Sequence, residues 1–454
     1  MDLNESLSKI KNKNYQVEIF GLGYVGFPLS IVLASSGVKV IGIDLDNKKL
    51  ERFKKGSLLE LEKNFRKDFN TVTKNGNLNF KKTLRFSKKT KIGIICVPTP
   101  ISKNLAKSNL NVKSAVKNFL NYCKKGDSII IESSIGVGTT DLIKKMIEKK
   151  GYQVGIDLGL SYCPERIDPQ NKKWDLNNIP RVIFCSDNIS FNIAKEIYRF
   201  VNKANLIRVS SPKVAEVVKS FENTFRLTNI SLVNELAILC EKLGINVTEV
   251  IKAASSKPFG FLPFYTGAGA GGHCIPKDPI FLANSSNNYA FKFNMIETAV
   301  KINQIVPKHI VNKINEILTK NKLEKSVIVC GLSYKTDMID MRDSPGFKIL
   351  NQLKKRKIFS VGFDPFFESD LLEKYLDENN MKNTKIKTIK NLDNKTISNF
   401  SCLCIVQHHS KIKNRINEIY EKSLIPVIYD CQNKIKKKNN SRSILQSFGC
   451  TSKT

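Results

Sequence analysis

Several features are missing from this sequence, and each absence excludes a class of protein. No apolar run is long enough to span a bilayer and no signal peptide is found, so we expect a cytoplasmic protein rather than a membrane or secreted one. The eleven cysteines include no CxxC pair and no His/Cys cluster at zinc-ligand spacing. We therefore expect reduced thiols, no disulfide framework and no bound metal.

Acidic residues are scarce relative to basic ones. Asp and Glu total 41 against 74 Lys and Arg, which gives a formal net charge of +33. Such an excess can indicate nucleic acid or an anionic membrane as partner. However, the lysines are spread along the chain, the one compact run is Lys434–Lys438, and aromatic residues do not interleave with basic ones. We expect a solvated, Lys-rich surface that helps to attract polyanionic small molecules. We expect neither nucleic-acid binding nor stable membrane association.

The length and the order of patterns predict the architecture. A chain of 454 residues, 41% of them hydrophobic, is too long for one core. Alternating strand and helix patterns come first, a helical middle follows, and strand–helix patterns return. This predicts an α/β protein with two Rossmann-like doubly wound domains joined by a long central helical region. The expected domains are residues 1–205, 206–310 and 311–454.

A dinucleotide-binding motif begins near the N-terminus. The apolar run Val17–Phe20 leads into Gly21–Gly26 (GLGYVG), and a helical pattern and a second apolar run, Val38–Ile43, follow. The first glycine permits a tight turn, the second lets the backbone approach a pyrophosphate, and the third allows close helix–strand packing. Asp44 follows about 20 residues later, the spacing of an acid that binds the ribose 2′-OH. A carboxylate there would repel a 2′-phosphate, so NAD is favoured over NADP.

Three polar residues follow further expected strands. Thr99, Ser134 and Glu165 come after apolar runs, and ligands bind beyond the carboxyl ends of strands in open α/β sheets. We expect all three to face the cofactor cleft, although each alone is equally consistent with a turn or a helix cap. The runs are Ile92–Val97, Ser128–Ile131 and Leu158–Cys163.

A helix is predicted over Pro212–Leu243, where apolar residues recur at steps of three and four. Lys219, Asn223 and Arg226 share one of its faces, which is either solvated surface or the lining of a cleft. Its apolar positions extend around more than one stripe, so more than one face must be buried. A second copy packed on the same helix would cover the remainder, which predicts a homodimer.

The segment 267–279 (GAGAGGHCIPKDP) places Cys274 in a loop with little bulk. Glycines allow a sharp turn and close approach of a ligand, and prolines restrict the exit. A cysteine is more often a small buried hydrophobe, but little that is apolar surrounds this one. We interpret Cys274 as a nucleophile, with His273 before it and Asp278 after it.

The last third contains a second strand–turn–helix pattern. Its strand, Ser326–Cys330, is followed by a turn with one glycine, so it could hold another nucleotide but lacks the dinucleotide fingerprint. Lys335 and Arg342 at this turn are candidates for phosphate or sugar contacts.

A nucleophilic cysteine beside a nicotinamide fits the oxidation of an aldehyde to an acid. The thiolate adds to the carbonyl, a hydride leaves the thiohemiacetal, and water cleaves the thioester. Lys219 would stabilise the developing alkoxide and Asn223 would donate a hydrogen bond to the same oxygen.

Four motifs together resemble the UDP-glucose/GDP-mannose dehydrogenase family: GLGYVG, ENTFRLTNISLVNELA, KPFGFLPFYTGAGAGGHCIPKDP and GLSYKTDMIDMRDSP. The resemblance covers nearly the whole chain and implies NAD-dependent oxidation of the C6 alcohol of a nucleotide sugar to a uronic acid. It implies that the catalytic residues are Cys274, Lys219, Asn223, Asp278 and Glu165, the last assisting thioester hydrolysis. The expected cofactor-binding residues are Gly21, Gly23, Tyr24, Val25, Gly26, Asp44, Thr99 and Ser134. The expected substrate-binding residues are Arg166, Arg226, Phe264, Tyr265, Gly267, Gly269, Gly271, His273, Lys335 and Arg342.

The chain departs from the family pattern at two positions: Ser134 stands where threonine is usual and Gln170 where glycine is frequent. A histidine before the cysteine is more similar to the enzymes that act on UDP-N-acetylhexosamines, so UDP-GlcNAc or UDP-ManNAc is the expected substrate and UDP-glucose the alternative. A hydroxyacid dehydrogenase would share the architecture but gives no role to Cys274. A non-catalytic basic nucleotide- or RNA-binding protein would explain the charge but not the clustered catalytic residues.

Overall fold

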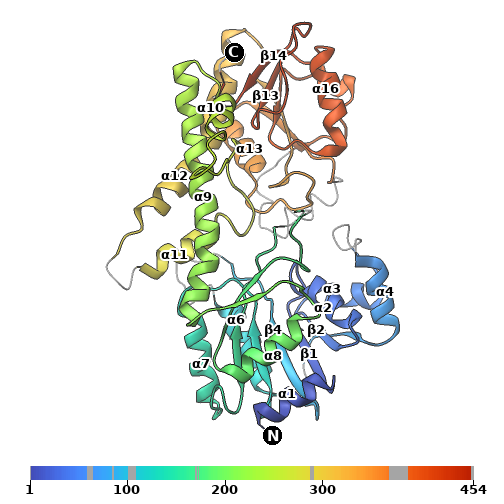
Figure 1. Ribbon diagram of the computed structural model, residues 1–454. Coiled ribbons are helices and arrows are strands. Elements are labelled where there is room, and N and C mark those ends of the chain that lie inside the picture. Colours follow the sequence, from blue (N-terminus) through green and yellow to red (C-terminus); the bar gives the residue numbers. More distant parts are fainter. Residues whose placement is uncertain are drawn as a thin grey trace. The chain divides into compact units, whose positions relative to one another are not determined.

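The computed structural model describes residues 2–58, 65–83, 86–100, 109–168, 171, 173–286, 291–367 and 387–450. The chain forms two compact units (Figure 1), Met1–Glu222 with Asn284–Phe291, and Asn223–Ala283 with Lys292–Thr454. The predicted division into three domains stays a prediction beside these two units. Gln170 lies outside the described residues.

The first unit is built on an eight-stranded sheet with the order β3-β2-β1-β4-β5-β6-β7-β8. Strands β1 to β6 run parallel, β7 is antiparallel to β6, and β8 is parallel to β7. The strand order reverses between β1 and β4, so their carboxyl ends form the switch point at which such sheets bind ligands. The bounds are Tyr15–Phe20 (β1), Lys39–Ile43 (β2), Leu78–Lys81 (β3), Thr90–Ile95 (β4), Ser128–Ile131 (β5), Gly159–Tyr162 (β6), Arg181–Cys185 (β7) and Leu206–Arg208 (β8).

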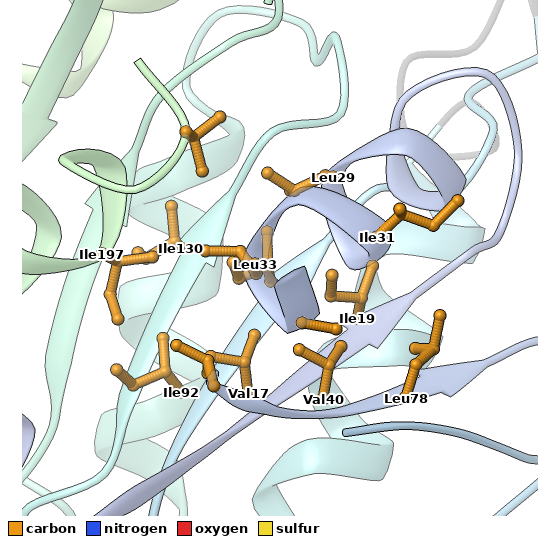
Figure 2. Packing of buried hydrophobic residues seen from close by; sticks show 14 of the residues in the cluster. Val17, Ile19, Leu29, Ile31, Leu33, Val40, Leu78, Ile92, Ile130 and Ile197 are labelled. Carbon is orange, nitrogen blue, oxygen red and sulfur yellow. The ribbon is translucent and has the colours of Figure 1, made fainter. Parts of the chain in front are cut away.

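Helices cover both faces of this sheet because its buried strands are apolar on both sides. One apolar cluster joins the sheet to α1, α2, α3, α4 and α8, and another joins it to α6 and α7. Figure 2 shows the first cluster, in which Val17 and Ile19 of β1 lie among the aliphatic side chains of α2. The helices are Leu3–Lys11 (α1), Gly26–Ser35 (α2), Asn47–Lys54 (α3), Arg66–Lys74 (α4), Leu110–Leu120 (α6), Thr139–Lys149 (α7) and Asn188–Tyr198 (α8).

The second unit has a six-stranded parallel sheet with the order β11-β10-β9-β12-β13-β14. Its cores pack α10, α12 and α13 with part of α9 on one face and α15 and α16 on the other. The strands are Ser326–Cys330 (β9), Phe359–Phe363 (β10), Lys387–Thr388 (β11), Cys402–Ile405 (β12), Val427–Asp430 (β13) and Ile444–Ser447 (β14). The helices that begin in this unit are Val247–Ala254 (α10), Asp278–Ser286 (α11), Asn294–Lys320 (α12), Pro345–Lys355 (α13), Asn394–Ile397 (α15) and Lys413–Glu421 (α16), with a 3-10 turn at Ser410–Ile412.

The long helix α9, Pro212–Leu243, has the bounds that its sequence pattern predicts. It ends at Gly244, whose φ of +76° is the left-handed conformation that terminates helices. The α/β class with two doubly wound sheets is confirmed. Among the described residues, no helix has both the length and the apolar character needed to cross a membrane.

Three ionisable side chains of the first unit are fully buried at its sheet. Glu18 lies on β1, Lys91 on β4 and Asp127 before β5, and the Lys91 Nζ is 3.9 Å from Asp127 Oδ2. Asp127 also accepts hydrogen bonds from the backbone N–H groups of Lys91 and Lys124. Glu18 accepts one from the Gln16 amide at 3.0 Å. Burial raises the pKa of Glu18 to about 7 and that of Asp127 to about 6.

Replacement of Glu18 by Gln should reduce the pH dependence of stability. The pKa of Glu18 rises from 4.5 to about 7 on folding, so its stabilising contribution is complete below pH 4.5 and is lost as pH rises through 7. Gln does not ionise, so the variant should lose less unfolding free energy between pH 5 and 8, by on the order of 2–3 kcal/mol.

Urea unfolding at several pH values, followed by the fluorescence of Trp174, measures the unfolding free energy of the first unit. Trp174 is the single tryptophan of the chain. Glu51→Gln on α3, where the side chain is exposed, serves as the control and should follow the unmodified protein. An unchanged pH dependence in the Glu18 variant would show that this carboxyl ionises equally easily in the folded chain.

Candidate active site

The turn after β1 has three glycines with different surroundings. Gly21 has φ +90°, and a Cβ on it would lie 2.8 Å from the carbonyl oxygen of Cys96. A Cβ on Gly26 would collide with the carbonyl oxygen of Gly21, whereas one on Gly23 would meet nothing within 4 Å. The fold therefore requires the first and third glycines, and the second borders open space, where the contact with a pyrophosphate stays a prediction.

Asp44 at the end of β2 holds this turn. Its Oδ2 accepts hydrogen bonds from the Leu22 N–H at 2.9 Å and from Lys49 Nζ at 2.8 Å, and its Oδ1 accepts one from the Asp46 N–H at 3.0 Å. Burial acts to raise the pKa of Asp44, but the hydrogen bonds from Lys49, Asp46 and Leu22 lower it below its ordinary value. The ionised carboxylate fits the predicted contact with a ribose. Lys49 was not predicted, although a lysine one helical turn beyond such an acid is a readable signal.

The next two strand ends are joined by a hydrogen bond from Thr99 Oγ1 to the carbonyl of Ser134 at 2.7 Å. The loop from Ser134 leads to α7, whose first turn is held by Glu216 of α9. Glu216 accepts hydrogen bonds from the Gly138 N–H at 2.6 Å and from the Thr140 N–H and Oγ1 at 2.8 and 2.7 Å. This role of Glu216 was not predicted, because an acid on a helix gives no sign in the sequence that it caps another helix.

Lys219 follows Glu216 by one helical turn and is buried in the first unit. Over the part of the chain that the structure describes, its ammonium group has no hydrogen-bond or ion-pair partner. The residue is 9% exposed, but its nitrogen is not among the polar atoms that are sealed from solvent, so an anionic reaction centre can approach it. This environment fits the predicted role of Lys219.

Glu165, after β6, accepts three hydrogen bonds. Its Oε1 takes the N–H groups of Arg166 and Ile167, both at 2.6 Å, and its Oε2 takes one Nη of Arg181 at 2.9 Å. The guanidinium of Arg166 bonds Glu222 at 2.6 Å and the carbonyl of Pro180 at 2.7 Å. Its predicted contact with substrate stays a prediction.

In the second unit, the loop before Cys274 is fastened by two buried asparagines that the sequence analysis missed. Asn234 of α9 accepts the Gly267 N–H at 3.1 Å, and Asn303 of α12 bonds both the N–H and the carbonyl of Ala270. The only signal in the sequence is a polar residue within an apolar helical pattern.

The two remaining glycines of the predicted substrate-binding residues, Gly269 and Gly271, also lie where a side chain is unfavourable. Gly269 has φ +110°, and a Cβ on Gly271 would lie 2.8 Å from the Asp343 carbonyl oxygen. The Gly272 N–H donates to the carbonyl of Arg342 at 2.9 Å. The loop therefore has a defined backbone path that larger residues would disturb.

Cys274 is half-buried, lies in no disulfide, and begins the turn that leads into α11. Its carbonyl accepts the N–H groups of Lys277 and Asp278 at 3.0 and 2.9 Å. The thiol therefore lies one turn before the first residue of α11, Asp278.

Asn223 and Asp278, which the sequence predicts as partners in catalysis, lie in contact inside the second unit. Asn223 Nδ2 donates to Asp278 Oδ2 at 2.6 Å. The other oxygen, Asp278 Oδ1, is buried and has no hydrogen-bond partner among the described residues. The Lys277 ammonium group lies 3.8 Å from this oxygen, which keeps the capacity to accept a hydrogen bond from water or from a substrate hydroxyl. Lys219 belongs to the first unit and Asn223, four residues later on α9, to the second.

The other predicted substrate residues of the second unit have varied surroundings. Arg342 pairs with Asp340 through two nitrogens, and Phe264 packs edge-on against Phe225 at 5.9 Å between ring centres. Tyr265 is exposed. The remaining three are half-buried: Arg226, His273 and Lys335. Within the described ranges, no group of three or more His, Cys, Asp or Glu could hold a metal ion.

Comparison with known proteins connects this geometry to one family. Residues 15–202 match the NAD binding domain of the UDP-glucose/GDP-mannose dehydrogenase family, residues 213–305 its central domain and residues 328–437 its UDP binding domain. A UDP-N-acetyl-D-mannosamine dehydrogenase of Methanococcus aeolicus is 34% identical over 95% of this chain and 94% of its own. A UDP-N-acetyl-D-glucosamine 6-dehydrogenase of Pseudomonas aeruginosa is 30% identical over 79% and 84%.

Solved structures of two dehydrogenases have folds similar to that of this chain. A UDP-ManNAc dehydrogenase from Pyrococcus horikoshii has a TM-score of 0.81 at 27% identity, covering 96% of this chain and 99% of that one. The UDP-N-acetyl-mannosamine dehydrogenase of Staphylococcus aureus has a TM-score of 0.81 at 30% identity, with coverage of 96% and 98%. Because three consecutive domains match models of one family, this NAD-dependent enzyme belongs to the UDP-glucose/GDP-mannose dehydrogenases.

Proposed function

We propose that the enzyme oxidises the C6 hydroxymethyl group of a UDP-N-acetylhexosamine to a carboxylate, consuming two NAD⁺ per sugar. The observation that carries this proposal is Cys274 in the turn before α11, where its carbonyl accepts the N–H of Asp278, the buried partner of Asn223. A nucleophilic thiol serves the aldehyde-to-acid half of such a reaction, through a thiohemiacetal and a thioester, and has no use in a simple alcohol oxidation. Relatives named as UDP-N-acetyl-D-mannosamine dehydrogenases make that sugar the first substrate to test.

Each of the proposed catalytic residues acts in a particular step of the reaction. NAD⁺, when bound, accepts a hydride from the substrate carbon in each oxidation. The Lys219 ammonium stabilises the alkoxide that forms at C6, and the Asn223 amide donates to the same oxygen. The Cys274 thiolate then adds to the aldehyde carbon to form a thiohemiacetal, which a second hydride loss converts into a thioester. Water cleaves the thioester with Glu165 as base, while Asp278 Oδ1 accepts a hydrogen bond at the reacting oxygen.

The site of action that fits this chemistry is the cytoplasm. None of the eleven cysteines forms a disulfide, which supports a reducing compartment.

The stoichiometry of NADH tests the reaction directly. With UDP-N-acetyl-D-mannosamine we expect two NADH per sugar and no released aldehyde, and slower turnover of UDP-glucose. Cys274→Ser should lower uronate formation by more than about 100-fold, because serine does not supply a comparable nucleophile. Cys450→Ser in the same unit, where the thiol is buried, is the control and should stay active.

Two results would contradict this reaction. One is a single NADH with a released aldehyde or ketone, and the other is unchanged turnover in the Cys274 variant.

We further propose that the enzyme is a homodimer built on α9. Apolar side chains recur on this helix at three-, four- and seven-residue steps, and each is 39% to 61% exposed. A continuous apolar stripe of this kind on a helix requires cover, and a second copy of the same helix gives a self-complementary two-fold interface. The stripe consists of Val214, Val217, Phe221, Phe225, Leu232, Leu239 and Leu243.

Light scattering at low micromolar concentration should give twice the mass of one chain. Leu232→Glu places a charge in the middle of the stripe and should shift the protein toward monomer. Leu110→Glu on α6, also an exposed leucine, should leave the mass unchanged. A stable, active monomer of the unmodified protein would show that the stripe needs no second copy.

A further inference from the structure

A buried arginine in the first unit joins two carboxylates. Arg181 begins β7 with its side chain 2% exposed. One of its terminal nitrogens is 3.2 Å from Glu132 Oε1 and the other is 2.9 Å from Glu165 Oε2. Glu132 is completely buried, whereas 12% of the Glu165 side chain is exposed. The arginine thus connects a sealed acid with one that solvent can reach.

The position of this guanidinium is fixed from a second direction. Its plane lies over the ring of Tyr198, with 4.8 Å from the guanidinium carbon to the ring centre. The Tyr198 hydroxyl donates to Glu132 Oε1 at 2.6 Å. Arg181 and Glu132 therefore share a rigid support on α8, and a planar fork is needed to reach both carboxylates at once.

Hydrogen bonds fix the orientation of the Glu165 carboxylate, as the role of a general base requires. An ionised carboxylate has about four acceptor positions, and three of those on Glu165 are taken by Arg166, Ile167 and Arg181. The remaining position is on Oε2, the oxygen that Arg181 orients.

Glu132 balances the charge of the arginine. Burial raises the pKa of Glu132, Arg181 opposes that rise, and the negative charge of Glu165 adds to it. The two carboxylates therefore influence each other across the shared guanidinium. With Glu132 present, the positive charge is divided between two acids rather than placed wholly on Glu165.

We infer that Arg181 is a positioning residue for thioester hydrolysis, supported by Glu132, and that it sets the orientation of Glu165 Oε2. This inference rests on the proposed function. In the step concerned, a water oxygen bonds to the thioester carbon and one water proton passes to Glu165. The carbon–sulfur bond breaks with its electron pair left on Cys274, and the new carboxylic acid loses its proton to solvent. Nothing is oxidised in this step, and Arg181 touches neither water nor sugar.

The test separates hydrolysis from the two oxidations. Arg181→Lys keeps the charge but reaches only one carboxylate. In rapid mixing it should release two NADH per active site at the normal rate, and steady-state turnover should then fall by about 100-fold, the cost of a misplaced catalytic group. Intact-mass spectrometry should find the acyl adduct on Cys274, as it should for Glu165→Gln. The exposed Arg208→Lys on β8, which alters a bond to Asn188, should show neither burst nor adduct.

Glu132→Gln gives an independent variant if the lysine variant folds poorly. It keeps the size of the side chain but places all of the arginine charge on Glu165, so it too should accumulate the adduct after a normal burst. The inference is overturned if both variants hydrolyse the thioester normally, or if they slow the first hydride transfer as much as the last. It is also overturned if Glu165→Gln accumulates the adduct and neither variant does. Failure of the unmodified enzyme to yield two NADH would instead refute the proposed function.

Discussion

Each sheet depends on a close contact between two glycines that leaves no room for a side chain. In both units the first glycine follows the first strand with φ near +90°, and a Cβ on the second would collide with the carbonyl of the first. An acid at the tip of the neighbouring strand accepts the backbone N–H after the first glycine, at 2.9 Å in one unit and 2.8 Å in the other. This contact holds a helix against the strand. It also fixes the carboxyl end of the sheet, where ligands bind in folds of this kind. The residues are Gly21, Gly26 and Asp44 in the first unit and Gly331, Gly346 and Asp364 in the second.

The two units use this common plan differently. In the first unit only a short turn separates the two glycines. In the second unit they are separated by a longer segment, which contains Lys335 and Arg342. Asp44 remains partly accessible, as contact with a ribose requires. Asp364 is sealed, with His409 Nε2 3.2 Å from its Oδ2. We propose that the acid of the first sheet contacts the dinucleotide and that the basic side chains of the second bind the UDP-sugar.

The sequence predicted those features whose signals are local. The bounds of α9 follow from Pro212 and Gly244, and the dinucleotide turn follows from glycine spacing. The strands β3, β7, β8, β11 and β14 were missed; β8 and β11 have only three and two residues, and β7 begins with a charged residue. In the site, the family resemblance named Asn223 and Asp278 as catalytic residues, and the structure shows them in contact. Arg181, Glu216, Asn234 and Asn303 were not predicted, because each acts through partners far away in the sequence.

A crystal structure of the Cys274→Ala variant with NAD⁺ and a UDP-N-acetylhexosamine tests the central claim most directly. The account predicts that the pyrophosphate of NAD lies against the backbone of Gly21–Gly26, with its adenosine ribose on Asp44. It predicts that the UDP group lies at the turn of the second sheet and that C6 of the sugar lies beside residue 274. A dinucleotide at the second sheet, or a sugar whose C6 is remote from residue 274, would contradict it.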